Sequence, residues 1–311
     1  MDHKLDYLSK MVFNKNTWKS VLGSHNMRIP EFCSDPLRSE IQHSREFRLT
    51  SSYLEEWNLL FGGGSADAIV PYSYYWPWMM EFLMHHLLPS LGLNLRHVLH
   101  LRQEAEFVGQ YRNGDGVYRN HQRLIDLCPL EKNRVMLVTE TIVTNQTECM
   151  VFRARDFTIV LDVPQTSLEA LCSSKSWNRT SLGFMKNGFR RKKPIFERAR
   201  DAPGRCTFYC DDDFWLRFGL VSGAVSLTHG YWLISRYFRK QDPFLQGMCT
   251  GNLVLYLLML ELGERLKGFE VSFSDKLYFP QQVELRFDDQ EFELFDEKNR
   301  QVAFGRRKKV L

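Results

Sequence analysis

Apolar and polar positions alternate along this chain in two successive blocks that follow the same order. In the first block an apolar, helix-competent stretch runs from Trp78 to Leu88 and stops at Pro89, because proline disrupts a helix interior. Segments with strand character follow, separated by polar or glycine-containing turns at 112–115 and 144–146. These segments are Val98–Phe107, Gly116–Leu127, Val135–Thr144 and Met150–Leu161.

The second block repeats this order. The stretch from Met248 to Leu266 has the length and apolar content of a buried helix. Strand-like segments follow it, namely Phe269–Tyr278, Gln282–Phe287, Phe292–Phe295 and Gln301–Lys308. The pattern predicts a central helix wrapped by an antiparallel sheet, occurring twice, so the expected fold class is α+β.

Length and composition divide the chain further. Its 311 residues exceed the usual size of one domain, about 100–200 residues, which favours two domains or a duplicated unit. The first 50 residues are polar and irregular, and the stretch 164–205 turns to Ser, Lys, Arg, Asn and Gly. We therefore expect an N-terminal extension (1–50), a first unit (51–163), a linker or surface excursion (164–205) and a second unit (206–311).

Charge changes this picture only locally. The formal net charge is +4, but part of the positive charge is gathered in two basic runs, Arg190–Lys193 and Arg306–Lys309. Such a run is most often a solvated surface or tail, and the functional alternative is a site for phosphate or for an acidic partner protein. No recognition-helix, zinc-finger or RNP pattern accompanies the charge, so nucleic acid is not an expected partner.

Cysteine usage and hydropathy indicate the compartment. Seven cysteines without a regular framework favour reduced thiols in a cytoplasmic protein. Cys206 and Cys210 have neither a second ligand pair nor a nearby histidine, so we expect no metal, and no other cofactor is indicated. The longest apolar run, Leu253–Leu260, is far shorter than the roughly 20 residues that span a bilayer, so the expected protein is soluble.

Three segments of the second half of the chain carry a resemblance to a known family. The stretch 222–229 reads Ser-Gly-Ala-Val-Ser-Leu-Thr-His, where the family has Ser-Gly-Asp-x-Asn-Pro-Ile/Leu-His. Gly247 falls where a His-Gly pair opens the family's long helix, and Phe279-Pro280 falls in the place of a Phe-Pro-Gly-Asp turn. In this order and spacing the chain resembles the MaoC-like (R)-specific enoyl-thioester hydratases and dehydratases. The resemblance implies a tandem, or double, hot-dog fold.

The same resemblance implies a chemistry and its residues. Hydration of a 2-enoyl thioester needs a base for the water, an acid for the alpha carbon and hydrogen-bond donors for the enolate-like oxygen. By position His229 matches the family's histidine and Ser226 replaces the asparagine that orients the site, so both are catalytic candidates, whereas Ala224 stands where the family has its aspartate. The substrate-binding candidates, which include the helix-start amide where negative charge is favoured, are Ser222, Gly223, Gly247 and Met248.

The missing aspartate leaves alternatives open, because loss of a positioned acid or base removes about 10²–10⁴ of rate. The leading hypothesis is a protein that binds a thioester on coenzyme A or acyl-carrier protein and catalyses reversible hydration. The second is a non-catalytic hot-dog binding or scaffold subunit. The third is a thioesterase, for which Glu261 and Glu264 are the helical carboxylates. Asp211–Asp213 lie upstream of the motif as possible replacement carboxylates, although an expected strand start there favours exposure.

The remaining residues of interest have plainer interpretations. His85, His86, His97 and His100 have no carboxylate or nucleophile at a telling spacing, and we interpret them as structural. Met248, Leu253, Leu257 and Leu260 recur at nearly helical spacing, which predicts a core stripe that in this fold also walls the acyl tunnel. Two units in one chain can pair internally, so a monomer with an internal pseudo-dimer and a homodimer both fit.

Overall fold

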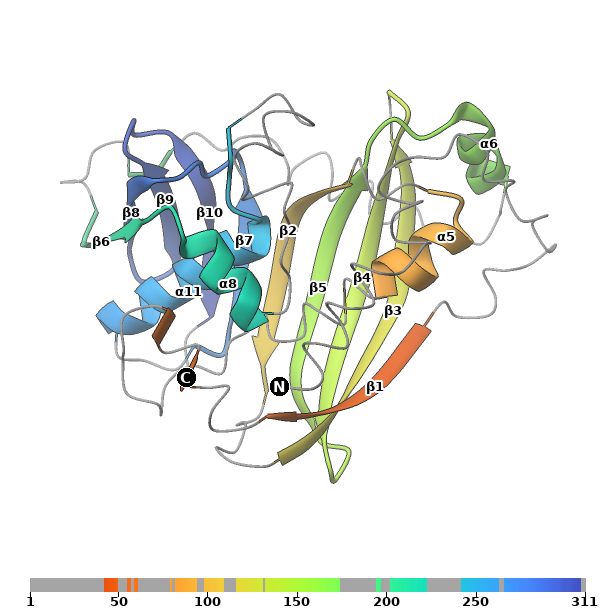
Figure 1. Ribbon diagram of the computed structural model, residues 1–311, viewed down its shortest axis with the longest axis horizontal. Coiled ribbons are helices and arrows are strands. Elements are labelled where there is room, and N and C mark those ends of the chain that lie inside the picture. Colours follow the sequence, from red (N-terminus) through yellow and green to blue (C-terminus); the bar gives the residue numbers. More distant parts are fainter. Residues whose placement is uncertain are drawn as a thin grey trace.

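A single antiparallel sheet organises the molecule (Figure 1). The computed structural model describes residues 42–49, 55–56, 59–60, 79, 82–93, 98–108, 116–130, 132–173, 194–196, 202–222, 242–262 and 266–308. The sheet has ten strands in the order β1-β3-β4-β5-β2-β7-β10-β9-β8-β6. Their bounds are β1 Gln42–Leu49, β2 Val98–Phe107, β3 Gly116–Leu130, β4 Arg134–Asn145, β5 Met150–Val160, β6 Gly204–Cys210, β7 Gly268–Phe273, β8 Gln281–Phe287, β9 Glu291–Asp296 and β10 Gln301–Lys308.

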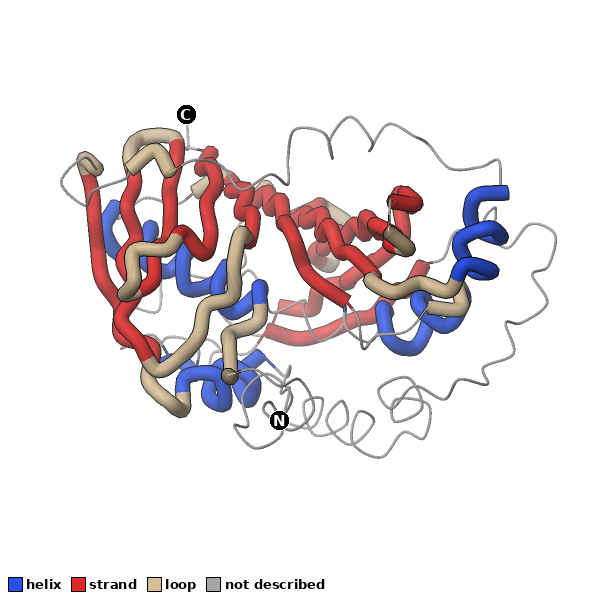
Figure 2. The backbone as a smooth tube through the Cα atoms, turned by 90° about the horizontal axis from the view of Figure 1, so that it is seen from above, coloured by secondary structure: helices blue, strands red, loops and turns tan. Residues whose placement is uncertain are grey.

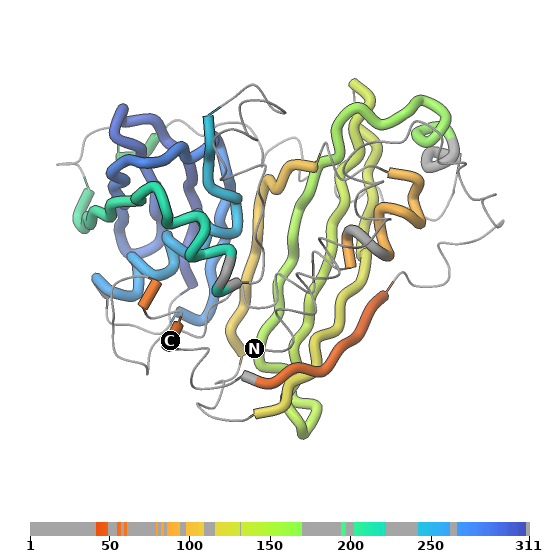
Figure 3. The backbone as a smooth tube through the Cα atoms, in the orientation of Figure 1, coloured from red at the N-terminus to blue at the C-terminus, as the bar shows by residue number. Residues whose placement is uncertain are grey.

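The strand order reads the same from both edges of the sheet. In each half the first strand along the chain lies at the edge, the next three in space are consecutive in sequence, and the second strand lies at the centre. The halves meet where β2 pairs with β7 in the register Gln103↔Val271, and Figure 3 shows the early strand beside the late one. The order of elements that the sequence repeats is therefore also repeated in the sheet.

Helices cover one side of the sheet (Figures 1 and 2). In the first half these are η1, a π-helical segment at Phe82–Leu87, and the short α5 at Leu88–Ser90. In the second half α11, Gly247–Leu262, lies against the strands, with α8, Phe214–Ser222, beside it. A further helix, α6 at Gln165–Ser173, follows β5. Among the described residues, no helix is long and apolar enough to cross a membrane.

The helix α11 is buried on nearly every side. Met248, Leu253 and Leu257 have at most 2% of their surface exposed, as the predicted core stripe requires, but so do Val254 and Leu258 on other faces. Leu260, the fourth member of that stripe, is 54% exposed, so its assignment to the core was wrong. The strands curve around the helix except near its last turn, which explains both observations.

Most strand predictions are confirmed. The bounds of β2 and β10 are the predicted ones, and β3, β4, β5, β8 and β9 differ from prediction by a few residues at their ends. The segment predicted as Phe269–Tyr278 is strand only over β7, and beyond it Tyr278 makes an isolated bridge to Phe244.

Other expectations need correction. The strand β1 lies inside the stretch interpreted as irregular. Its polar residues Gln42, Ser44 and Glu46 are exposed, while Phe47 on the other face is buried. The helix α6 lies in the stretch expected to be linker. The first helical segment ends at Ser90, one residue after Pro89, and not at Leu88 as predicted. The turn expected at 112–115 lies outside the described residues.

Candidate functional site

The structure describes the start of the long helix but not the motif that precedes it. Gly223, Ala224, Ser226 and His229 lie outside the described residues, and Ser222 is the last residue of α8, where its side chain is not described. Gly247 is the first residue of α11, and Met248, the second, is fully buried. The described part of the site is therefore built around Gly247.

Two side chains from neighbouring strands face Gly247. A Cβ atom added there would lie 3.2 Å from the ring of Phe273 on β7 and 3.3 Å from Nδ1 of His100 on β2. The two rings pack against each other with their centroids 5.2 Å apart. Because even the methyl group of an alanine would crowd these rings, glycine lets the backbone of the first helical turn lie close against His100 and Phe273.

His100 also contacts a buried carboxylate. Its Nε2 lies 3.1 Å from Oδ1 of Asp156 on β5, and the same oxygen accepts a 2.7 Å hydrogen bond from Nε2 of Gln103. The side chain of Asp156 is fully buried and that of His100 is 9% exposed. A buried carboxylate requires such partners, since an isolated charge in the interior is strongly disfavoured.

A bulge in β2 places these side chains on one face. His100 is in register with Thr158, and Gln103 with Asp156, with an irregularity between His100 and Arg102. Thr158 and Asp156 are two residues apart and point to the same face of the sheet. The extra residue in β2 brings His100 and Gln103, three apart in sequence, to that face as well.

The arrangement supports acid and base chemistry. A neutral imidazole with its hydrogen on Nε2 avoids repulsion between two acceptors at the 3.1 Å that separates Nε2 from the carboxylate oxygen. This tautomer leaves Nδ1 as the acceptor, and Nδ1 is the atom that faces Gly247. The helix dipole at the start of α11 favours negative charge at the same place.

Sequence reasoning missed this pair. It interpreted His100 as structural because no carboxylate stood at a telling spacing, and Asp156 is 56 positions away along the chain. The signal that could have found it is the burial pattern of β5. Asp156 occupies the same face as Phe152, Ala154 and Val160, all of which are buried, and an acidic residue at such a position needs a partner.

The other residues singled out from the sequence lie elsewhere. Asp211–Asp213 precede the helix α8 rather than a strand, and Asp212 and Asp213 are exposed, while Asp211 pairs with Arg217 at 2.6 Å. Glu261 is exposed near the end of α11, and Glu264 lies outside the described residues. His86 is exposed and stacks on His43, and the side chains of His85 and His97 are not described.

The two basic runs have different outcomes. Arg190–Lys193 lies outside the described residues. The described part of Arg306–Lys309 belongs to β10, where Arg306 is exposed and pairs with Glu291. Arg307 is buried and contacts Asp289 and the carbonyl of Asp288, so its interpretation as a solvated tail was wrong. Strand alternation sends neighbouring residues of such a run to opposite faces.

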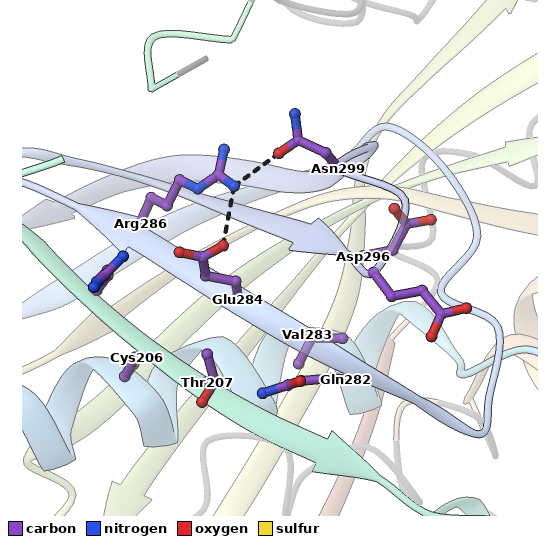
Figure 4. Close-up of a pocket in the computed structure, with 10 residues that line it drawn as sticks. Cys206, Thr207, Gln282, Val283, Glu284, Arg286, Asp296 and Asn299 are labelled. Atoms are coloured by element: carbon purple, nitrogen blue, oxygen red, sulfur yellow. Dashed lines mark hydrogen bonds and ion pairs between the residues drawn. The ribbon is translucent and has the colours of Figure 1, made fainter. Parts of the chain in front are cut away.

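A polar groove lies at the far edge of the second half, between β6, β8 and the β9–β10 turn (Figure 4). Arg286 donates to Glu284 at 3.0 Å and to Asn299 at 2.7 Å, so its charge is already partnered. Cys206 also lines the groove, but burial first and the charges of Glu261 and Glu284 next raise the pKa of its thiol to about 12. A protonated thiol is a poor nucleophile, so this groove has no evident catalytic group. Among the described residues no group of three or more potential ligands could hold a metal ion.

Comparisons with known proteins find similarity in structure alone. No family model and no curated protein matches the chain. The full-length peroxisomal multifunctional enzyme type 2 from Drosophila melanogaster matches with a TM-score of 0.61 and 15% identity over 86% of this chain and 48% of that one. A MaoC-like dehydratase from Phytophthora capsici matches with a TM-score of 0.62 and 13% identity over 88% and 96%. The 12:0-ACP thioesterase from Umbellularia californica matches with a TM-score of 0.50 and 8% identity over 86% of this chain and 96% of that one.

These similarities establish an α+β hot-dog fold, with its large antiparallel sheet and few helices. The chain spans about half the length of the Drosophila enzyme and nearly the whole of the Phytophthora one. At these identities the comparisons describe the fold and leave the chemistry to the residues of this chain.

Proposed function

We propose that this chain is a tandem double hot-dog protein that binds an acyl thioester of coenzyme A or acyl-carrier protein and catalyses reversible hydration of its 2-enoyl group. The observation that carries the proposal is the His100–Asp156 pair at the start of α11, with Nδ1 of the imidazole facing Gly247. The structural neighbours named as MaoC-like dehydratases support the reaction class.

The geometry suggests how the reaction proceeds. The thioester carbonyl accepts hydrogen bonds from backbone N–H groups at the start of α11, which stabilise the enolate-like oxygen. Nδ1 of His100 takes a proton from water as the water oxygen bonds to the beta carbon of the enoyl group. The protonated His100 then gives this proton to the alpha carbon, which restores the neutral imidazole, and the reverse sequence eliminates water. Asp156 orients the imidazole and favours the required tautomer.

The residues proposed from the sequence fit around this centre. His229 and Ser226 are placed as further catalytic candidates, and Ser222 and Gly223 as substrate contacts, on the resemblance of their motif. Gly247 provides the close approach between the helix start and His100. In this proposal His100 and Asp156 provide the acid and base function of the family aspartate, whose place is taken by Ala224. Met248 is fully buried behind Gly247, which fits a wall of the site better than a direct polar contact.

One alternative keeps support from a specific observation. Ala224 favours a non-catalytic protein that holds an acyl group for a partner. Thioesterase chemistry has weaker support, because Glu261 is exposed about 20 Å along α11 from the helix start, at 1.5 Å per residue. A thioesterase mechanism would need a carboxylate next to the thioester carbonyl.

The same proposal extends to the group that carries the acyl chain and to the oligomeric state of the protein. The phosphates of coenzyme A or the acidic helix of a carrier protein would meet the basic runs, where Arg306 and Lys308 are described and exposed. The palindromic strand order imitates the pairing of two subunits, so we propose a monomer with an internal pseudo-dimer, with a homodimer as the alternative, in the cytoplasm.

The test is a spectrophotometric assay that follows loss of enoyl absorbance with short and medium 2-enoyl-coenzyme A substrates. Wild type is compared with His100→Gln, Asp156→Asn and His229→Ala. We expect His100→Gln to lower kcat by about 10²–10⁴-fold, since it removes a positioned base. His121→Gln is the matched control, because His121 lies on β3 in register with Ile142, on the opposite face of the sheet.

The outcomes separate the candidate functions. Loss of turnover in His100→Gln and Asp156→Asn, with melting temperatures near wild type, supports the proposed acid and base pair. Full activity in His100→Gln would refute it. Absence of turnover in the wild type, with thioester binding measurable by calorimetry, would identify the non-catalytic binding protein, and release of free coenzyme A would identify a thioesterase.

A further inference from the structure

The inner face of the first half of the sheet, which faces the helices, carries hydrogen-bonding side chains in its middle. Asn120 on β3 is 2% exposed, and Thr139 and Thr141 on β4 are 1% and 0% exposed. Leu137 and Val143 lie on the same face of β4 as the two threonines, and both belong to the main core cluster. The three polar residues therefore point into the interior and not to solvent.

These residues are continuous with the candidate site. Thr139 is in register with Asp156, which in turn is in register with Gln103, so one row of polar side chains crosses β4, β5 and β2. Thr141 lies in the next row beside Gln122 of β3. Because neighbouring strands are about 4.8 Å apart, Thr139 lies about 10 Å from the strand of His100.

Several of these polar atoms have no partner within the described part of the chain. Both side-chain atoms of Asn120 and the hydroxyls of Thr139 and Thr141 are buried without a hydrogen bond there. Buried polar groups in folded proteins are almost always hydrogen-bonded, and each exception needs an explanation. Three neighbouring exceptions on one face indicate a place where a ligand supplies the missing partners.

The second half shows that the fold does not need polar residues at these places. Its inner face carries Val283 and Leu285 on β8 and Phe292 and Leu294 on β9, the strands that correspond to β3 and β4 in the repeated order. All four are buried in the main core cluster. The polar residues of the first half therefore depart from what packing alone would favour.

We propose that this polar face, Asn120, Thr139 and Thr141, binds an acyl chain that carries oxygen groups, either hydroxyls or carbonyls, rather than a plain hydrocarbon chain. The inference rests on the proposed function, because it places the thioester at the start of α11 and runs the chain across β5 toward β4. Threonine hydroxyls and the asparagine amide both donate and accept, which suits hydroxyl and carbonyl groups equally. A plain chain would leave all of them without partners.

The test compares saturated probes that bind without hydration. The dissociation constants of decanoyl-coenzyme A and its mid-chain and terminally hydroxylated counterparts are measured by calorimetry. We expect at least one hydroxylated probe to bind about tenfold more tightly than the plain one, which corresponds to one or two added hydrogen bonds. The Thr139→Val and Thr141→Val double variant should lose this preference and bind the plain chain at least as tightly as wild type.

The matched control is Thr144→Val, on the same strand but in register with Arg119 on the opposite face. It should keep the preference of the wild type. A wild type that binds the plain chain as tightly as every hydroxylated probe would overturn the inference.

A second measurement addresses a purely structural role. Without ligand, the double variant should melt at or above the wild-type temperature, because methyl groups replace hydroxyls that lack partners. A fall of several degrees would show that the hydroxyls are bonded within the protein or to buried water, and would refute the inference.

The two proposals fail in different ways. If no coenzyme A thioester binds at all, the proposed function fails. Melting-temperature shifts with decanoic acid and its hydroxylated counterparts then decide the present inference directly, and equal shifts would overturn it.

Discussion

The two halves of the sheet share a strand order but differ in what their inner faces bury. The second half buries Phe292, Leu294 and most of α11 against apolar strands. The first half buries Asp156, Asn120 and two threonines at the corresponding depth. Leaving one buried polar group without a partner costs about 1–3 kcal/mol, a large share of the 5–15 kcal/mol that stabilises a typical domain. Packing alone therefore accounts for the inner faces of β8 and β9, but not for the polar residues on the inner faces of β3 and β4.

The outer faces differ in a related way. Glu140 on β4 and Glu293 on β9 both have 1% exposure. Glu140 pairs with three arginines at positions 123, 153 and 155, which are each about one-third to two-fifths exposed. Glu293 accepts hydrogen bonds from the backbone N–H groups of Ile195 and Phe196 and from Gln301. One half thus balances its buried acid with charge, and the other with neutral dipoles.

The largest expected effect comes from making the second half resemble the first. Leu294→Thr removes a fully buried side chain and places a hydroxyl where the apolar neighbours offer no partner. We expect a loss of about 4 kcal/mol in the free energy of unfolding, from the cavity and the unbonded hydroxyl together. Urea denaturation followed by circular dichroism measures it.

Leu260→Thr is the control for this substitution, since Leu260 is 54% exposed on α11. It should cost about 0.5 kcal/mol, mostly from helix propensity. A cost below 1 kcal/mol for Leu294→Thr would contradict the view that the second half is a packed apolar core.

A smaller loss in the free energy of unfolding is expected when Glu140 or Glu293 is replaced, and its size should differ between the two. Burial would raise the pKa of Glu140, but hydrogen bonds and charges from Arg123 and Arg153 outweigh it and lower the pKa below its ordinary value of 4.5. We expect Glu140→Gln to cost about 2 kcal/mol at pH 7, because it leaves three arginines without their common partner. The contribution of a depressed carboxyl is complete above its unfolded pKa and declines as pH falls through the folded one. The difference between wild type and variant should therefore shrink below about pH 4.5.

Glu293→Gln provides the comparison. It should cost about 1 kcal/mol, since the amide oxygen still accepts from the backbone, and 1 M salt should leave that cost unchanged. Salt should reduce the cost of Glu140→Gln, because the arginines are partly exposed and screened. Equal salt dependence in the two variants would contradict the distinction between charge and dipole partners.

The sequence predicted the fold where local pattern and packing agree. The apolar alternation of β2 and β10 gave their bounds, and the length of the apolar stretch predicted α11. It failed where tertiary contacts decide. β1 shows few apolar residues because only one of its faces is covered, and α6 has a composition typical of surface loops.

The candidate site was predictable only in its local part. Gly247 could be found because its place at the start of a helix is a feature of neighbouring residues. His100 and Asp156 could not be paired in advance, because their contact depends on the pairing of β2 with β5 and on a bulge that changes the facing of His100. Such a bulge adds one residue to the strand, so the side chains on one side of it point to the opposite face from the one that strict alternation predicts.

The smallest effect on stability, and the sharpest one on function, is expected where the two halves meet. Gly247→Ala places a methyl group 3.2–3.3 Å from Phe273 and His100, so these rings must shift by a few tenths of an ångström. Alanine favours the helix by up to about 1 kcal/mol over glycine, which offsets the crowding, so the melting temperature should change by no more than a few degrees. Binding of a saturated acyl-coenzyme A should weaken at least tenfold if the thioester carbonyl sits against this helix start.

Gly251→Ala, one turn further along the same helix, is the matched control, because it tests the helix without the neighbourhood of His100. Because residue 251 is itself buried, the melting temperature of the Gly251→Ala variant is measured together with its affinity for the acyl-coenzyme A. A loss of binding confined to Gly247→Ala would show that the space between α11 of one half and β2 of the other receives the ligand. Equal binding by Gly247→Ala and wild type would mean that the thioester lies elsewhere, and that the His100–Asp156 pair serves only the junction of the two halves.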